Sequence, residues 1–405
     1  MKLLHLFNSI FVPPSEGSGS KTHNYFLSRG FEQLGHQVVR VQPGIRNAER
    51  DFELNKARAF YRALKFVFPK MVTDWMRDFY CIIHDFRFET TIREAITIEK
   101  PSLIYERFTD FHRSGLRAAK KAKVPYVVEI HETAEARRYT QKLNFHHYND
   151  YVLMKVATGA DMVVVVSSML RDYFTRKGVL GKKILVLPNA VDLELFRSTG
   201  QGHRIRRGLG ISAEETVIGL VGGMHPYHGI DLLPDVCELI RNECPKVKLL
   251  IVGGFKRYKG GLSAFKSMLK ERRIDNYFIL TGGVPIEEVP GYIEAMDICL
   301  MPDSNAYGSP LKLFEYGALS KPCIMPRYRP VLDVLVDGQT GLIFQPKSIK
   351  DMADKITTLM HDEGLRESLG KNLYNLVSEK HTWHRNARTI LGRVSSIISS
   401  ESHQR

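Results

Sequence analysis

The sequence predicts an α/β protein built from two doubly wound parallel-sheet domains that face a central cleft. Short apolar runs alternate with helical patterns along the whole chain, which is typical of βαβ units. The 405 residues exceed the size at which a single hydrophobic core stops growing, so two domains are expected. The segment 197–212 is polar and basic, contains glycine and lacks a clear period, so it is the best candidate for a linker. Ligands of such domains bind at the carboxyl ends of the strands, which here would line the cleft.

The predicted elements are spread evenly over the two halves. Strands are predicted at 3–8, 37–42, 103–106, 126–130, 162–166, 184–187, 217–221, 248–252, 278–281, 298–301, 322–325 and 341–344. Helical stretches that separate them include 21–34, 231–242, 263–272 and 350–360.

Composition narrows the class of protein. The hydrophobic content of 43% is sufficient for sizeable cores and argues against disorder. The five cysteines form no Cys-x-x-Cys pair and are odd in number, which indicates reduced thiols in a cytosolic setting, without a disulfide framework or a zinc site. Residues 1–8 are expected to form a first buried strand, since their apolar part is too short for a signal peptide. No apolar run is long enough to predict a membrane span.

The formal charge of +14 indicates an anionic partner. No nucleic-acid recognition module or aromatic-basic repeat is apparent, so nucleic acid is not expected. The remaining candidates for this partner are an anionic membrane surface and a phosphorylated, lipid-linked substrate. The segment 56–68 is basic and amphipathic and would suit an interfacial helix, although a packed helix with a solvated cationic face has the same pattern.

Four loops follow predicted strands and are therefore expected at the cleft. In the first, Gly17 and Gly19 precede a helix that carries His23. Two glycines before a helix N-terminus let a ligand approach the backbone closely, but a flexible turn gives the same letters. We count these three residues as candidate substrate-binding residues of the first half.

The second half holds the other three loops. Gly222 and Gly223 end one strand with His228 close behind, and two glycines after the next strand precede Lys256 and Arg257. Loops that combine exposed amides with Lys or His suit phosphate groups. The second half is therefore predicted to hold a diphosphate.

The fourth loop opens the segment Ser-Pro-Leu-Lys-Leu-Phe-Glu-Tyr, in which Ser309, Pro310 and Leu311 lie at the predicted helix start. A helix N-terminus attracts anions through its unpaired amides and its dipole. Lys312 in the first turn opposes that dipole unless an anion lies in front of both, and Glu315 follows at i+3 on the same face. A cation for phosphate beside a carboxylate for sugar hydroxyls suits a nucleotide sugar. An ordinary amphipathic helix with a solvated Lys and Glu fits the same letters.

Several motifs, in their order and spacing, resemble those of the retaining, family-four glycosyltransferases of the GT-B fold over nearly the full length of the chain. They correspond to the family's domain junction, first phosphate loop, strand and turn, "aaD" helix, donor helix and the Trp before a terminal helix. The matching segments are 188–196, 221–229, 280–285, 292–297, 309–316 and 382–383.

This resemblance implies an organisation into three parts. Residues 1–197 would form an N-terminal Rossmann-like acceptor-binding domain, and residues 198–380 a C-terminal Rossmann-like domain for the nucleotide sugar. Residues 381–405 would form a helix that packs back on the N-terminal domain.

The resemblance also implies roles for the donor-binding residues. Glu315 would bind the ribose hydroxyls of the nucleotide. Lys312 and the backbone amides of Gly222 and Gly223 would hold the donor diphosphate. Val284 would lie near the base.

In the N-terminal domain, the resemblance implies that Gly17 and Gly19 approach the donor or the acceptor. His131 matches a strand-end histidine near the transferred sugar, although a histidine satisfied within the core would give the same pattern. With Lys312 and Glu315, His131 completes the set of predicted catalytic residues.

Three departures from the family pattern stand out. The first of two acids separated by seven intervening residues is Tyr307 here, and Asp303 or Asn305 from the same loop is the predicted substitute. The family's Arg and Lys of the phosphate loop are Gly223 and His228. Altered donor preference is expected from these changes.

Because two fixed cations are missing, Lys312 must supply the charge, together with Lys256 or Arg257. His228 would act as a cation only when protonated, and otherwise as a neutral donor.

The expected activity is transfer of a sugar, with retained configuration, from a nucleotide-diphosphate sugar to a hydroxyl of a glycan, lipid-linked or small-molecule acceptor. The chain contains no Asp-x-Asp, so no metal and no cofactor beyond the donor are expected. The departing phosphate would take the acceptor proton, as the resemblance implies. The expected location is cytoplasmic, with peripheral contact at the inner face of an anionic membrane.

Two alternatives remain open from the sequence. A non-hydrolysing nucleotide-sugar 2-epimerase shares the two-domain fold, but its chemistry requires positioned acids that the motifs do not match. A catalytically degenerate binding protein is the other alternative, which Tyr307, Gly223 and His228 keep open.

Overall fold

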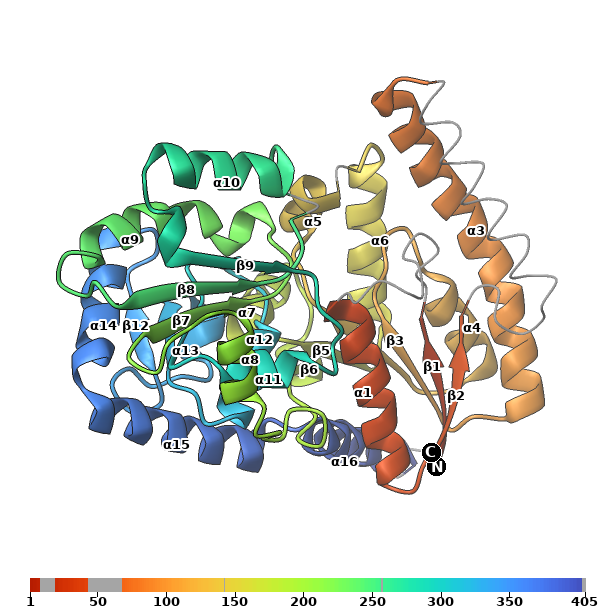
Figure 1. Cartoon of the computed structure of the whole chain (residues 1–405). Coiled ribbons are helices and arrows are strands. Elements are labelled where there is room, and N and C mark those ends of the chain that lie inside the picture. The colour runs from red at the N-terminus through yellow and green to blue at the C-terminus, as the bar shows by residue number, and fades with distance from the viewer. Residues whose placement is uncertain (8–18, 43–67, 142, 256–257, 403–405) are drawn as a thin grey trace. The chain divides into compact units, whose positions relative to one another are not determined.

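The computed structural model describes residues 1–7, 19–42, 68–141, 143–255 and 258–402, and these form two α/β units (Figure 1). Unit 1 comprises Met1–Leu187 and His384–Arg405, and unit 2 comprises Pro188–Trp383. Unit 2 thus begins at Pro188, where the sequence analysis placed the boundary after residue 197. Four predictions fall outside the described residues, namely those on Gly17, Lys256, Arg257 and the segment 56–67.

Unit 1 is built on a parallel sheet with the strand order β2-β1-β3-β4-β5-β6. Its strands are β1 (Lys2–Leu6), β2 (Gln37–Val41), β3 (Leu103–Arg107), β4 (Tyr126–Ile130), β5 (Met162–Val165) and β6 (Ile184–Val186). The described helices are α1 (Gly19–Gln33), α3 (Lys70–Glu99), α4 (Ser114–Ala122), α5 (Ala134–Gln141), α6 (His146–Gly159), α7 (Ser168–Arg176) and the part of α16 (Trp383–Ser402) from His384 on. The central strands are mostly apolar and almost completely buried, as expected for a parallel sheet covered on both faces.

Unit 2 contains a second parallel sheet with the strand order β12-β11-β10-β7-β8-β9. Its strands are β7 (Thr216–Val221), β8 (Val247–Val252), β9 (Phe278–Gly282), β10 (Ile298–Leu300), β11 (Cys323–Pro326) and β12 (Leu342–Phe344). The helices are α8 (Gly202–Gly208), α9 (Leu233–Ile240), α10 (Gly261–Glu271), α11 (Val289–Glu294), α12 (Leu311–Ala318), α13 (Arg329–Leu332), α14 (Ile349–His361) and α15 (Glu363–Lys380). Side chains of α9, α10 and α14 share one core with the sheet, and those of α11, α12 and α15 share another. The sheet is therefore doubly wound, as predicted.

All twelve predicted strands are present, with ends that differ by one or two residues. Continuous apolar runs can form strands here because both faces of each sheet are covered, so that side chains on either face are buried. The four predicted helices are also confirmed as α1, α9, α10 and α14.

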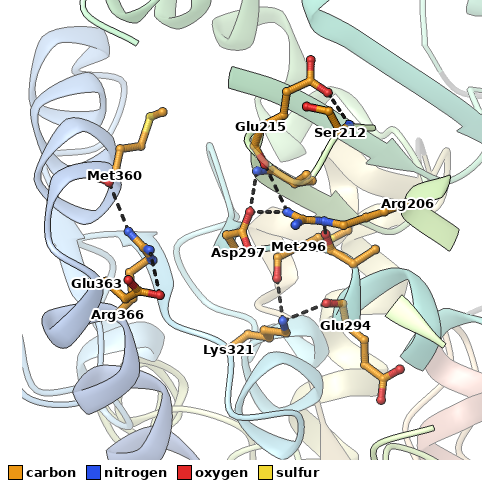
Figure 2. Close-up of polar contacts among 12 residues, drawn as sticks. Arg206, Ser212, Glu215, Glu294, Met296, Asp297, Lys321, Met360, Glu363 and Arg366 are labelled. Atoms are coloured by element: carbon orange, nitrogen blue, oxygen red, sulfur yellow. Dashed lines mark hydrogen bonds and ion pairs between the residues drawn. The ribbon is translucent and has the colours of Figure 1, made fainter. Parts of the chain in front are cut away.

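The predicted linker 197–212 is wrong in part, because it contains the helix α8. Five hydrogen bonds from the segment 198–201 to the carboxylate of Glu294 hold the chain just before this helix. Figure 2 shows Arg206 of α8 reaching Asp297, while the Lys321 ammonium donates to the main-chain oxygens of Glu294 and Met296. These contacts come from residues about 90 positions away, so no local sequence pattern reveals them.

Helix α3 has one buried and one exposed apolar face. The side chains of Phe88 and Ile92 are fully buried against unit 1, whereas a row on the other side of the helix is exposed by 42% to 75%. This exposed row follows the i, i+4 spacing of a single helix face. It consists of Met71, Trp75, Phe79, Ile83 and Phe86.

Candidate functional site

The order of the strands locates the candidate site of unit 2. The strand order reverses between β7 and β10. These two strands pair with each other in the sheet, although β8 and β9 lie between them in the sequence. In open parallel sheets, ligands bind outside the carboxyl ends of the strands at such a switch point. Here β7 leads into Gly222 and β10 leads into the loop 301–310 before α12. The two predicted phosphate loops therefore meet where the topology favours a ligand.

Helix α12 is anchored at its N-terminus by the junction segment. Pro310 directly precedes α12, as predicted, and no side chain caps the helix. The Asn189 amide donates to the Ser309 carbonyl (2.7 Å), and the backbone N–H of Asn189 donates to the Ser309 hydroxyl (3.1 Å). The Pro-Asn segment thus fixes the position from which the free amides of α12 point outward.

The middle of α12 is anchored to β7 and α15. The backbone N–H of Val221 donates to the hydroxyl of the fully buried Tyr316 (3.1 Å), so this tyrosine joins α12 to the end of β7. At Gly317 a Cβ would come within 2.7 Å of Val377 on α15, so the close packing of the two helices requires glycine there. These contacts fix the rotation of α12 about its axis.

Lys312 and His228 both lie close to the position that a Cβ at Gly222 would occupy. A Cβ at Gly222 would be 3.6 Å from Lys312 Nζ and 3.9 Å from His228 Cε1. Gly222 itself has a φ of +129°, which side chains rarely tolerate. The structure therefore brings together three predicted site residues around an open point at the switch position.

Lys312 is a buried cation without a counter-ion in contact. Its side chain is only 8% exposed, and Nζ has no hydrogen-bond partner among the described residues. Burial lowers the pKa of Lys312 to about 8, although the neighbouring Glu315 raises it. Burial likewise raises the pKa of Glu315 to about 7, against the influence of Lys312. A buried donor left unsatisfied is costly, so this arrangement favours an anionic ligand.

The backbone of the neighbouring loop closes this space from below. Gly253 has a φ of +149°, and a Cβ there would overlap the Gly222 carbonyl oxygen at 1.8 Å. The backbone N–H of Gly222 donates to the carbonyl of Val252, which aligns the ends of β7 and β8. Gly223 is exposed and follows directly.

Asp303 and Asn305, the two predicted substitutes for the missing acid, lie in the loop after β10. One carboxylate oxygen of Asp303 accepts from the Tyr328 hydroxyl (2.8 Å) and from the N–H of Ser304 (2.9 Å). Asn305 Oδ1 accepts from the backbone N–H groups of Tyr307 and Gly308 and so shapes the loop itself. Both predicted substitutes thus have structural contacts within the loop.

Val284 lies two residues beyond the end of β9 and packs, half-buried, against the core that includes α12. The predicted base-binding position is therefore on the same side of the unit 2 sheet as α12.

In unit 1, the predicted residues His131 and His23 meet through a third side chain. The carboxylate of Glu129, on β4, accepts from His131 Nε2 and from His23 Nε2, both at 2.9 Å. The Tyr105 hydroxyl of β3 donates to the same carboxylate (2.8 Å). All three donors converge on one anion at the carboxyl ends of β3 and β4. Burial would raise the pKa of Glu129, but His23 and His131 hold it well below its usual range.

A neighbouring guanidinium determines the tautomer of His131. Arg107 Nη2 lies 3.3 Å from His131 Nδ1, and because Arg only donates, Nδ1 must carry the lone pair and Nε2 the proton. Burial, followed by the charge of Arg107, lowers the pKa of His131 to about 3. His131 is therefore neutral with both nitrogens engaged, which makes it a poor general base.

The ligand atoms of His23, Glu129 and His131 lie within 4.8 Å of one another, close enough to hold a metal ion. The proton on His131 Nε2 occupies the position that a metal would need, and Arg107 would repel a cation. The hydrogen bonds thus favour a polar network without a metal at this point.

Sequence reasoning missed several of these residues. Tyr105, Arg107 and Glu129 are polar residues in or at the ends of otherwise apolar strands, and this pattern would have singled them out. Asn189 and Tyr316 carry no such signal, because their partners are distant in the sequence.

Comparison with known proteins agrees with this architecture. The family model described as Glycosyltransferase Family 4 matches residues 17–195, and the model described as Glycosyl transferases group 1 matches residues 203–376. The two models together cover most of both units.

Relatives and solved structures give the same picture. An uncharacterized glycosyltransferase of Methanocaldococcus jannaschii is 21% identical over 251 residues, which are 62% of this chain and 62% of that protein. The capsular polysaccharide biosynthesis glycosyltransferase CapM of Staphylococcus aureus is 26% identical over 301 residues, covering 70% of this chain and 73% of CapM. Anabaena HepE, solved with UDP and glucose, superposes with a TM-score of 0.71 at 16% identity, over 98% of this chain and 100% of HepE.

Two parallel-sheet units of this topology, with the likeness to HepE, define the GT-B fold. The chain belongs to the group 1, family 4 glycosyltransferases. Because both models describe transferases, the 2-epimerase alternative is not favoured.

Proposed function

We propose that this enzyme transfers a sugar from a nucleoside-diphosphate sugar to a hydroxyl group with retention of configuration. The observation that carries the proposal is the buried Lys312 ammonium, which lacks a partner among the described residues and lies beside Gly222 at the free N-terminus of α12. A diphosphate in that space would satisfy the ammonium, the helix amides and the exposed amide of Gly223 together.

The proposed chemistry depends on stabilising the leaving group. As the diphosphate departs, negative charge develops on its oxygens, and a fixed cation and oriented amides in a dry site lower the barrier by a few kcal/mol, on the order of 3 for one such donor. Glu315, one helical turn from Lys312, is proposed to bind the ribose hydroxyls. Because burial raises the pKa of Glu315 to about 7, its carboxyl group is present in both the protonated and the ionised form near neutral pH. A ligand hydroxyl can form a hydrogen bond with either form. We propose no metal clamp, since the chain contains no Asp-x-Asp.

The acceptor is proposed to be a glycan or a lipid-linked glycan. Support comes from the name of CapM, which refers to capsular polysaccharide biosynthesis, and the HepE structure holds UDP and glucose. A small-molecule acceptor is the other option within the same activity.

The decisive experiment is a binding screen followed by product analysis. Thermal melts with UDP, GDP, ADP and dTDP should show one nucleotide raising the melting temperature, because a ligand of the folded state stabilises it. The matching sugar nucleotide should then release free nucleoside diphosphate in the presence of acceptor. Recovery of an isomerised donor, or of intact donor with no nucleotide binding, would contradict the proposal.

We propose in addition a cytoplasmic location with peripheral contact to an anionic membrane. None of the described helices is long and apolar enough to cross a bilayer. Support for surface contact comes from the charge of +14 and the exposed apolar row of α3. The double variant Trp75→Ser, Phe86→Ser should sediment less with phosphatidylglycerol vesicles, while Ile98→Ser, exposed by 67% outside that row, should not change sedimentation. Equal sedimentation of both variants would contradict contact through this face.

A further inference from the structure

The imidazole of His228 belongs to the candidate phosphate site, although the neutral ring cannot donate a hydrogen bond to a phosphate. His228 Cε1 lies 3.9 Å from the position that a Cβ at Gly222 would occupy, and Lys312 Nζ lies 3.6 Å from the same position. The short turn Pro226–His228 places it there, and Gly229 follows with a φ of +67°. At Gly229 a Cβ would come within 2.6 Å of Asp303 Cβ, so the loop after β10 holds the turn in place.

A hydrogen bond determines which nitrogen of His228 is protonated. Nδ1 lies 2.6 Å from the carbonyl oxygen of Gly223, and because a carbonyl only accepts, Nδ1 must carry the proton. In the neutral ring, Nε2 then has a lone pair and no proton. A phosphate oxygen also offers only lone pairs, so neutral His228 has nothing to donate to it.

The groups around His228 keep it neutral while the site is empty. Burial and then the charge of Lys312 lower its pKa to about 2, and His225, 5.6 Å away between ring centroids, adds to this effect. The Tyr227 ring packs edge-on at 4.5 Å. Of the nearby acids, Asp303 accepts from Tyr328, and Glu315 lies on α12 beside Lys312.

We propose that His228 is a proton-dependent phosphate ligand, which takes up one proton on Nε2 from solvent when a nucleoside diphosphate binds. This inference rests on the proposed function. The bound diphosphate brings several negative charges next to Lys312 and His228, and their attraction for the imidazolium offsets the burial and the charge of Lys312 that disfavour it. Protonated His228 then donates from Nδ1 to Gly223 and from Nε2 to a phosphate oxygen. The affinity for the diphosphate thereby becomes linked to pH.

The experiment is calorimetric titration with UDP and GDP between pH 6.5 and 7.5, in buffers of different ionisation enthalpy, which counts the protons exchanged. Lys312 is mostly charged in this range, and Glu315 and the nucleotide contribute equally in all variants. His228→Asn keeps an N–H group near the Nδ1 position and removes Nε2. Wild-type protein should take up about one proton more per nucleotide than His228→Asn, and its affinity should change up to about tenfold more per pH unit.

Two further variants sharpen the result. His228→Lys supplies a permanent cation, so it should bind at pH 7.5 at least as tightly as wild type, with the proton count of His228→Asn. His203→Gln on the exposed side of α8 should behave as wild type. Independently of any variant, the imidazole ¹⁵N resonances of His228 should shift on addition of nucleotide to the positions of a doubly protonated ring.

The outcomes separate this inference from the proposed function. Nucleotide binding with equal proton counts for wild type and His228→Asn, or an imidazole that stays neutral in the complex, would overturn the role of His228 alone. The absence of binding by every nucleoside diphosphate would overturn the proposed function and this inference with it.

Discussion

The polar clusters at the carboxyl edges of the two sheets differ in how completely they are satisfied. In unit 1, the Glu129 carboxylate accepts hydrogen bonds from His23, His131 and Tyr105, so one anion has three donors. In unit 2, the buried Lys312 ammonium has no hydrogen-bond partner among the described residues. The donors of the unit 1 cluster have their hydrogen-bond acceptor without a ligand, whereas the Lys312 ammonium would gain one from a bound anion.

This difference indicates a division of labour. A network of mutually satisfied groups is rigid, and its members stabilise the fold of unit 1. An unsatisfied buried cation costs folding free energy, which binding of an anion recovers. The Glu129 cluster thus stabilises unit 1, whereas the buried Lys312 lowers the stability of unit 2, a cost that its proposed role in binding a phosphate would explain.

Removal of the carboxylate from the unit 1 cluster should have the largest effect. Glu129→Gln leaves one acceptor for three donors and removes the main charge that stabilises Arg107, so the free energy of unfolding of unit 1 should fall by about 3–5 kcal/mol. The Kd for nucleotide, which depends on unit 2, should stay unchanged while the transfer rate drops. Urea unfolding and calorimetry measure the two quantities. Glu94→Gln, on the exposed side of α3, is the matched control, and a change of Kd in Glu129→Gln would refute the division.

Replacement of the cation in unit 2 should act in the opposite direction on stability. Lys312→Met keeps the side-chain length, removes the buried charge, and should raise the free energy of unfolding without ligand by about 1–2 kcal/mol. The same change should weaken nucleotide binding about 100-fold, since a charge-assisted contact contributes about 1.5–3 kcal/mol. Calorimetry with the nucleotide from the binding screen measures the loss.

Lys350→Met is the matched control, because Lys350 lies on the surface of unit 2 with its side chain 82% exposed. It should change neither quantity. A destabilised Lys312→Met protein with unchanged affinity would mean that Lys312 is a structural residue like those of the unit 1 cluster.

The backbone of the unit 2 site can be tested with two adjacent glycines. Gly253→Ala combines a φ of +149° with an overlap on the Gly222 carbonyl, so it should cost about 1–3 kcal/mol and displace the loop beneath the ligand. Gly254→Ala meets nothing within 4 Å and should be neutral. Thermal melts with and without nucleotide separate the two effects. Equal behaviour of both variants would show that the approach of Gly253 to Gly222 is unimportant.

The smallest predicted difference is an acid sensitivity of unit 1. Burial lowers the pKa values of His5 and His131 to about 3 and that of His84 to about 4, below the unfolded value of 6.5. Each therefore contributes stability that is complete above pH 6.5 and is lost as the pH falls toward the folded value. Glu106, whose pKa burial raises to about 8, acts in the opposite direction between pH 8 and 4.5. The net loss should be at least about 1 kcal/mol per pH unit between pH 6.5 and 4.5.

The two tryptophans report the units separately, because Trp75 lies in unit 1 and Trp383 is assigned to unit 2. Fluorescence-monitored urea unfolding of Trp383→Phe follows unit 1, and that of Trp75→Phe follows unit 2. The midpoint for unit 1 should fall more steeply with acidification. A steeper fall for unit 2 would contradict the assignment of the buried histidines.

Much of the fold and part of the site could be predicted from the sequence. The strands were predictable because a short apolar run between two helical patterns is typical of a strand buried in a parallel sheet. The start of α12 followed from Pro310, and the meeting of Gly222 with Lys312 followed from the rule that ligands bind at the carboxyl ends of strands. The helix α8 was missed because its stabilising contacts lie on Glu294 and Asp297, far along the chain.

The sequence by itself determined the two parallel-sheet units, the family and the identity of the cation and glycines that we propose to bind the ligand. Only the tertiary structure decided their chemical state. It engages both nitrogens of His131, leaves the ammonium of Lys312 without a partner among the described residues, and turns the protonated nitrogen of His228 toward Gly223. The physical reason is that protonation and pairing depend on burial and on neighbours brought together by long-range folding, which no local pattern of residues records.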